Sequence, residues 1–71
     1  MTRYLEITLK NGSKVLATID YLPSDWTEKQ VQAEFAEYLI ILILKGEDKA
    51  FVAHGVEVPI KEIEDFRLVV K

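Results

Sequence analysis

Few residues in this chain have the types and spacing that catalysis or metal binding requires. The 71 residues include one histidine, His54, and no cysteine. A histidine base or metal site needs partners, and motifs such as H-x-x-x-H need a second histidine. Because His54 precedes Gly55 in a dipeptide typical of turns, we interpret it as a turn residue. We therefore expect no cofactor and no metal.

Carboxylates form the densest polar group, and their oxygens can bind Mg²⁺ or Ca²⁺. The acidic residues of this group are Glu57, Glu62, Glu64 and Asp65. They lack EF-hand spacing and have basic neighbours, so a solvated surface is the favoured interpretation. Ser13 and Ser24 lie outside any G-x-S-x-G motif, and the three glycines are too scattered to form a phosphate-binding loop. We expect a protein that is not an enzyme.

Aromatic residues are the remaining candidates for function, because they concentrate at binding hot spots. The possible interaction surface consists of Tyr4, Tyr21, Trp26 and Tyr38. Tyr4 is expected on the outward face of the first strand, and Tyr21 and Trp26 flank a predicted helix start. A structural interpretation stays open for three of them: Trp26 can anchor the helix start, and Tyr4 and Tyr21 can pack beneath the helix.

Composition and charge limit the partners. The hydrophobic fraction of 49% is at the top of the usual range, and so short a chain buries only about 60% of its unfolded surface. This surplus predicts a dense core or a subunit interface. The net charge of −3, without a strongly basic segment, argues against nucleic acid, whose binding depends on phosphate neutralisation.

The pattern of apolar residues also bears on location. Glu6 interrupts the first apolar residues, so we expect no signal peptide. The longest apolar run, residues 38–44, is far shorter than the ~20 residues of a membrane-spanning helix. We expect one cytoplasmic domain over residues 1–71, with no membrane contact.

Alternating apolar residues over 2–9 and 13–19 predict an antiparallel hairpin. A two-residue turn would place apolar residues opposite polar ones, so we predict a three-residue loop, Lys10–Gly12, with Gly12 in the left-handed conformation. Such a loop gives the pairs Leu9–Ser13, Ile7–Val15 and Leu5–Ala17.

A helix is predicted next. Thr27 and Gln30 have the spacing of a capping box, with Trp26 and Val31 at the positions of a hydrophobic staple. Ser24 is a rival N-cap one turn earlier. The helix is expected to bury Val31, Phe35 and either Tyr38 or Leu39.

The run from Tyr38 to Leu44 has two interpretations. The helix can continue to Leu44, with Gly46 as the residue after its C-cap. Alternatively it ends near Tyr38, and residues 39–44 form a strand. Isoleucines at 40, 41 and 43 favour the strand, and a helix apolar all round would need more cover than this chain supplies. We predict a strand covered on both faces, and infer from it that a second subunit is wanted.

The remaining chain reads as strands and turns. Residues 45–49 form a loop, and residues 50–58 form one bent strand or two strands joined at His54-Gly55. In the second case Ala53 pairs with Val56 and Phe51 with Val58. Residues 60–65 contain a single helical or 3₁₀ turn, and a last strand covers residues 66–70.

These elements predict an α+β fold in the order β-β-α-β-β-(short helical turn)-β. We expect a small, strongly bent antiparallel sheet or open barrel with one covering helix. Residues 7–12, Ile-Thr-Leu-Lys-Asn-Gly, and the stretch from Val58 to Leu68 resemble small-barrel proteins of the Sm and SH3 kind. The helix after the second strand departs from both families, so no functional residue is carried over.

Two classes of function compete. The first is a non-enzymatic protein-interaction or self-assembly module whose partner is a protein, with a homodimer as the simplest form. The alternative, which the barrel resemblance implies, is nucleic-acid binding through Arg3, Lys10 and Lys14 on the first hairpin. A minor alternative, from size and acidity, is an acidic inhibitor or an accessory protein of a phage or mobile element.

Overall fold

The computed structural model contains five strands, one α-helix and one 3₁₀ turn. In chain order these are β1 (Arg3–Leu9), β2 (Lys14–Thr18), α1 (Glu28–Leu44), β3 (Lys49–Ala53), β4 (Val56–Pro59), the 3₁₀ helix η1 (Ile60–Glu62) and β5 (Ile63–Val70). The predicted α+β class and the predicted element order are therefore confirmed.

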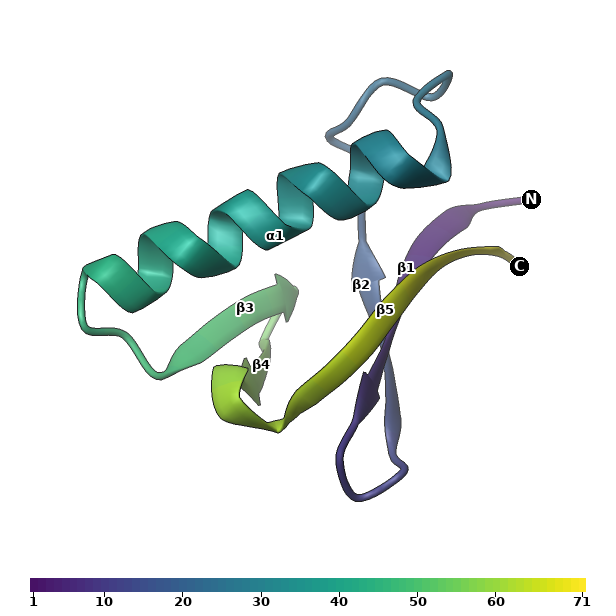
Figure 1. Cartoon of the computed structure of the whole chain (residues 1–71). Coiled ribbons are helices and arrows are strands. Elements are labelled where there is room, and N and C mark those ends of the chain that lie inside the picture. The colour runs from purple at the N-terminus through teal and green to yellow at the C-terminus, as the bar shows by residue number, and fades with distance from the viewer.

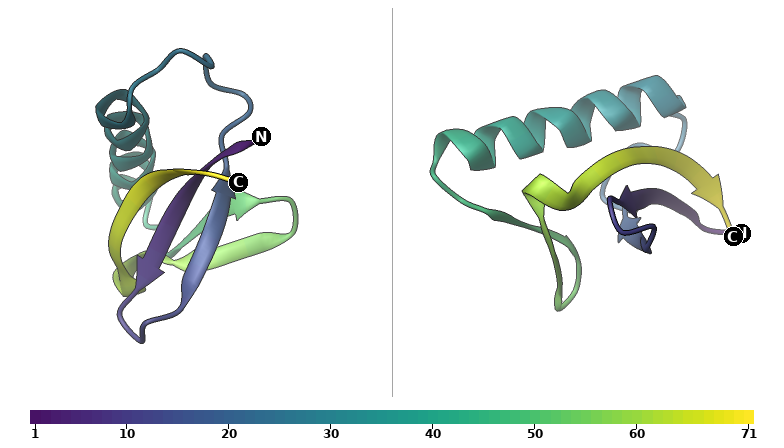
Figure 2. Two further views of the ribbon diagram at one scale, coloured as in Figure 1. Left: turned by 90° about the vertical axis from the view of Figure 1, so that its right-hand side faces the viewer. Right: turned by 60° about the horizontal axis from the view of Figure 1, so that its bottom comes forward.

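The strands form two antiparallel sheets. One has the order β2-β1-β5 and the other contains β3 and β4, and together they do not close into a barrel. Helix α1 lies across both sheets, with its first turns over β5 and its last turns over β3 (Figure 1). Figure 2 shows β5 as a strongly curved strand. Its end lies beside the start of the chain, where Thr2 and Lys71 exchange two backbone hydrogen bonds.

The first hairpin has the predicted register. Leu5 lies opposite Ala17 and Ile7 opposite Val15, and the Leu9 amide donates to the Ser13 carbonyl at 2.8 Å. Gly12 has a φ of 89°, in the region that side chains disfavour. The loop Lys10–Gly12 thus sets which residues face the core.

Helix α1 begins as predicted. Thr27 is the N-cap: its hydroxyl accepts from the Gln30 amide at 3.3 Å, and its own amide donates to the Gln30 side chain at 2.8 Å. This capping box satisfies two amides that the first turn leaves free. Val31 and Phe35 are the buried residues of α1.

The predicted strand over residues 39–44 is wrong, because α1 continues to Leu44. A Schellman motif ends the helix: the Gly46 amide donates to the Ile43 carbonyl, and the Glu47 amide donates to the Leu42 carbonyl. Gly46 has a φ of 81°, which this motif requires. The predicted order of elements still holds, because residues 49–59 form two strands, β3 and β4, and the second of these replaces the strand lost from residues 39–44.

The second hairpin confirms the two-residue turn but corrects the register. Ala53 lies opposite Val56 as predicted, whereas a bulge places Phe51 opposite Glu57 and Ala50 opposite Val58. Because a shift of one residue reverses the faces of a strand, Phe51 points outward and is 64% exposed. The predicted Phe51–Val58 pair is wrong for this reason.

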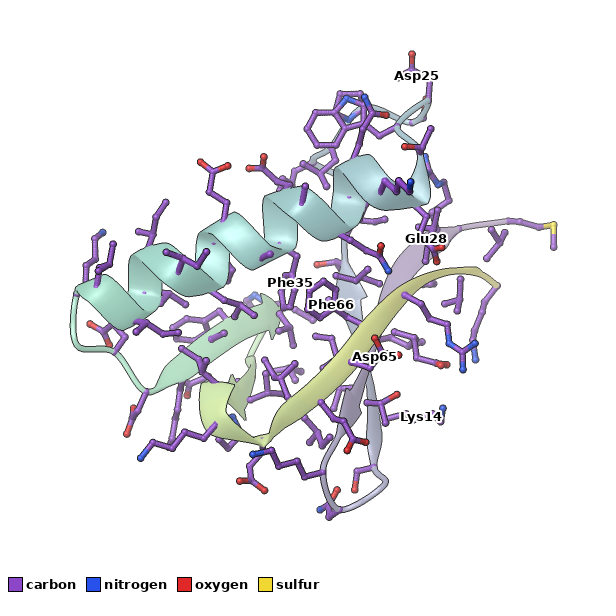
Figure 3. The ribbon with its side chains drawn as sticks, in the orientation of Figure 1. Lys14, Asp25, Glu28, Phe35, Asp65 and Phe66 are labelled. Atoms are coloured by element: carbon purple, nitrogen blue, oxygen red, sulfur yellow. The ribbon has the colours of Figure 1, made fainter.

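The core lies between α1 and the two sheets. Nine buried hydrophobic residues form it: Leu5, Ile7, Ala17, Ile19, Val31, Phe35, Ala50, Val52 and Val58. Phe35 of α1 meets Phe66 of β5 edge to face, with ring centroids 5.0 Å apart (Figure 3). This aromatic pair fastens the helix to the larger sheet.

Candidate interaction surface

The outward face of α1 carries an apolar stripe. Its members are Ala33, Ala36, Ile40, Ile43 and Leu44, which we call the outer seam. Residues three and four apart share one face of a helix, so this spacing makes the stripe continuous. Ile40 and Ile43 are each 56% exposed and Leu44 is 81% exposed. The side chains of the seam are large near the C-terminal end of the helix and small near its middle.

A groove of about 430 Å³ lies between α1 and the ends of β2 and β3. Buried residues form its floor: Ala17, Ile19, Val31, Phe35 and Val52. Tyr21, Tyr38 and Phe51 line its sides, and Glu34 is its only ionised side chain. The volume and the mostly apolar lining with few polar groups are typical of ligand-binding clefts.

Tyr38 fixes one wall of this groove. Its hydroxyl donates to the Phe51 carbonyl and accepts from the Phe51 amide, both at 3.2 Å. The open edge of β3 is thus satisfied by a side chain at this residue rather than by another strand. The Thr18 hydroxyl of β2 donates to the Val52 carbonyl of β3 at 3.4 Å, which links the larger sheet to the smaller one.

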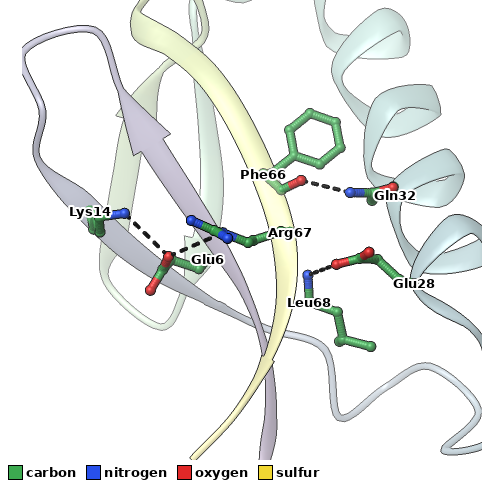
Figure 4. Close-up of polar contacts among 7 residues, drawn as sticks. All are labelled: Glu6, Lys14, Glu28, Gln32, Phe66, Arg67 and Leu68. Atoms are coloured by element: carbon green, nitrogen blue, oxygen red, sulfur yellow. Dashed lines mark hydrogen bonds and ion pairs between the residues drawn. The ribbon is translucent and has the colours of Figure 1, made fainter.

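Helix α1 covers the free edge of β5 in the same manner (Figure 4). The Gln32 amide group donates to the Phe66 carbonyl, and the Glu28 carboxylate accepts from the Leu68 amide, both at 2.8 Å. These contacts occupy edge groups to which a fourth strand would bind. An interaction surface on this side of the larger sheet is therefore already taken by the helix.

The four aromatic residues predicted to form one surface do not lie together. Tyr21 and Tyr38 line the groove. Trp26 is half-buried and packs against the core at the helix start, the structural role that was left open for it. Tyr4 lies in β1 between Thr18 and Val69, on the sheet face opposite Leu5 and Ile7.

The outer seam, Glu34 and Phe51 were not predicted from the sequence as parts of an interaction surface. The signal for the seam was present, because Gly46 stands where a helix ending at Leu44 would need it. Phe51 could not be placed outward without the bulge in β3. Glu34 carried no signal, since it is one of several carboxylates on the helix.

Two of the three cations of the first hairpin, Arg3 and Lys14, are engaged with other groups of the protein. The Arg3 guanidinium donates to the carbonyls of Ser24 and Trp26, which ties β1 to the segment before α1. Lys14 and Arg67 both approach Glu6, at 3.5 and 3.8 Å (Figure 4). Arg3 and Lys14 thus make contacts within the protein itself.

The remaining polar candidates lie on the surface. His54 is exposed in the turn between β3 and β4, next to Gly55 with a φ of 72°. The acidic residues Glu57, Glu62, Glu64 and Asp65 are also exposed. No group of three or more His, Cys, Asp or Glu side chains is placed to hold a metal ion.

Comparison with known proteins returns no family, no curated relative and no solved structure that matches this chain. In the structure itself, α1 is not of the length and apolarity needed to cross a membrane, and no other helix is. Any functional assignment rests on the surfaces described above.

Proposed function

We propose that this protein is a non-enzymatic self-assembly module that forms a homodimer through the outer seam of α1. One observation carries the proposal: the last helical turns leave Ile40, Ile43 and Leu44 in water. Residues 39–44 are helical, so the two-sided strand from which a second subunit was expected does not exist. The exposed helix face gives an independent argument, since apolar side chains gathered on one face favour a partner.

The seam is suited to a second copy of itself. A two-fold interface needs a self-complementary surface, because the same residues contribute from both subunits. If two helices cross antiparallel, the large residues Ile40 and Ile43 of one copy lie against the small Ala33 and Ala36 of the other. Small residues let helices approach closely, and large ones fill the space that remains.

The proposal includes a cytoplasmic location. The alternative of nucleic-acid binding gains no support from Arg3 and Lys14, since both contact groups of the protein itself.

Sedimentation velocity from low to high micromolar concentration tests the proposal. We expect a dimer whose fraction, and whose melting temperature, rise with concentration. Ile40→Glu should weaken the dimer at least about tenfold, because it buries a charge at the interface while adding none to the monomer core.

Val70→Glu is the matched control, since Val70 is 52% exposed and directly precedes the last residue, and the C-terminus lies at the opposite end of the molecule from the last turns of α1 (Figure 1). This variant should dimerise like the unmodified protein. A monomer at every concentration with an unchanging melting temperature would contradict self-assembly. Equal dimerisation of the two variants would place the interface elsewhere.

A further inference from the structure

The groove beside α1 has features that self-association through the outer seam does not use. Tyr21 and Phe51, at its sides, are 71% and 64% exposed, although both are large aromatic residues. Its floor includes Val31 and Phe35, which are 1% and 7% exposed. The groove therefore offers aromatic sides that are open to solvent above an apolar floor.

The groove also carries unbalanced negative charge. Glu34 has no cationic partner within 4 Å, because both ion pairs of the chain belong to Glu6. Asp20 lies close enough to act on Tyr21 as well. Partial burial of the Tyr21 phenol, and then the charges of Glu34, Tyr38 and Asp20, raise its pKa. The surroundings of Tyr21 thus favour positive charge.

The walls are held in place before anything binds. The Tyr38 hydroxyl is fixed by two hydrogen bonds to Phe51, and Val52 accepts from Thr18. A site that is already ordered loses little conformational entropy on binding.

We propose that this groove binds a basic, apolar segment of a partner polypeptide. The aliphatic stem of a lysine or arginine lies on the floor, and its charge meets Glu34. Long basic side chains bury their stems while the charged end remains near water and carboxylates. Aromatic sides add attraction for a cation. The site thus gives the module a partner besides a second copy, and it excludes acidic ligands.

Two peptides test the proposal: a blocked hexapeptide that alternates lysine and leucine, and one with glutamate in place of lysine. Binding is followed by calorimetry and by the NMR chemical shifts of the protein's backbone amides. The lysine peptide should bind at least about tenfold more tightly than the glutamate peptide, and its affinity should fall as salt is added. It should change the amide chemical shifts of Thr18, Phe51 and Ala53.

Glu34→Gln should weaken binding of the lysine peptide about threefold, as expected for an exposed ion pair. Glu37→Gln is the matched control, because it makes the same change one turn away and outside the groove. Equal affinity for both peptides, shifts confined to the outer seam, or equal loss in both variants would overturn the proposal. Repeating the titration with Ile40→Glu separates this result from self-assembly, since the peptide should still bind when dimerisation is lost.

Discussion

Gly12 shows how a single residue sets the register of the first hairpin. Its φ of 89° lies where a side chain strains the backbone, and beyond the adjacent residues no atom lies within 4 Å of the position that a Cβ would take. Gly12→Val should therefore lower the free energy of unfolding by about 1–3 kcal/mol through backbone strain alone. Denaturant unfolding measures the change.

Gly12→Asn is the control for this prediction, because asparagine tolerates positive φ better than other side chains. It should recover a large part of the lost stability. If Gly12→Val unfolds at the same denaturant concentration as the unmodified protein, the loop conformation described here is incorrect.

Tyr21 provides a pH-dependent test of the groove. A phenol whose pKa is raised in the folded state keeps its proton to a higher pH than in the unfolded chain. Its contribution to stability is complete below the ordinary value of 10.0 and is lost as the pH rises through the folded-state pKa. The effect is small because Tyr21 is 71% exposed.

Tyrosinate absorbance follows this titration, with Tyr21→Phe identifying the contribution of Tyr21. Glu34→Gln should lower the pKa of Tyr21 without restoring its ordinary value, because burial remains the larger cause. Glu37→Gln should change it less. A Tyr21 that titrates with an ordinary pKa would remove the electrostatic support for the groove.

At the scale of elements, the Thr27 side chain stabilises the start of α1. Thr27→Ala removes the hydroxyl that accepts from the Gln30 amide, and should cost about 1 kcal/mol. Ser24→Ala, at the rival N-cap one turn earlier, should cost much less. Thermal unfolding by circular dichroism compares the two. A larger loss of stability in Ser24→Ala than in Thr27→Ala would indicate that the helix begins one turn earlier.

The ends of α1 differ in how well the sequence predicts them. Its start depends on local hydrogen bonds between Thr27 and Gln30, which the spacing of these two residues predicts. Its end depends on a choice between strand and helix for residues that suit both. The isoleucines pointed to a strand, but no residue from Glu37 to Leu44 breaks a helix, and Gly46 terminates one. Local signals thus favoured neither conformation clearly, and the helix is the conformation in which Tyr38, Leu39 and Leu42 pack against the core.

At the scale of the whole molecule, Phe35 joins the helix to the larger sheet. Phe35→Ala removes its contacts with Phe66 and Tyr38 and should cost about 3–5 kcal/mol. A chain this short has a total stability of roughly 4–10 kcal/mol, so the variant should be partly or wholly unfolded at room temperature.

Phe51→Ala is the matched control, because the same atoms are removed at a site that is 64% exposed. Its stability should stay within about 1 kcal/mol of that of the unmodified protein. Denaturant unfolding of both variants decides the matter. If they lose stability equally, the core is not centred on Phe35.

The sequence by itself determined the class of fold, the first hairpin with its register and the start of the helix. Each of these depends on residues within a few positions of one another, through alternation, turn geometry or capping. Only the tertiary structure decided that residues 39–44 are helical, that Phe51 faces outward and that Tyr21, Glu34 and Tyr38 share one groove. The helix and the groove depend on contacts between segments far apart in the chain, whereas the orientation of Phe51 depends on a bulge in β3. In each case packing chooses among conformations that the local residues permit equally.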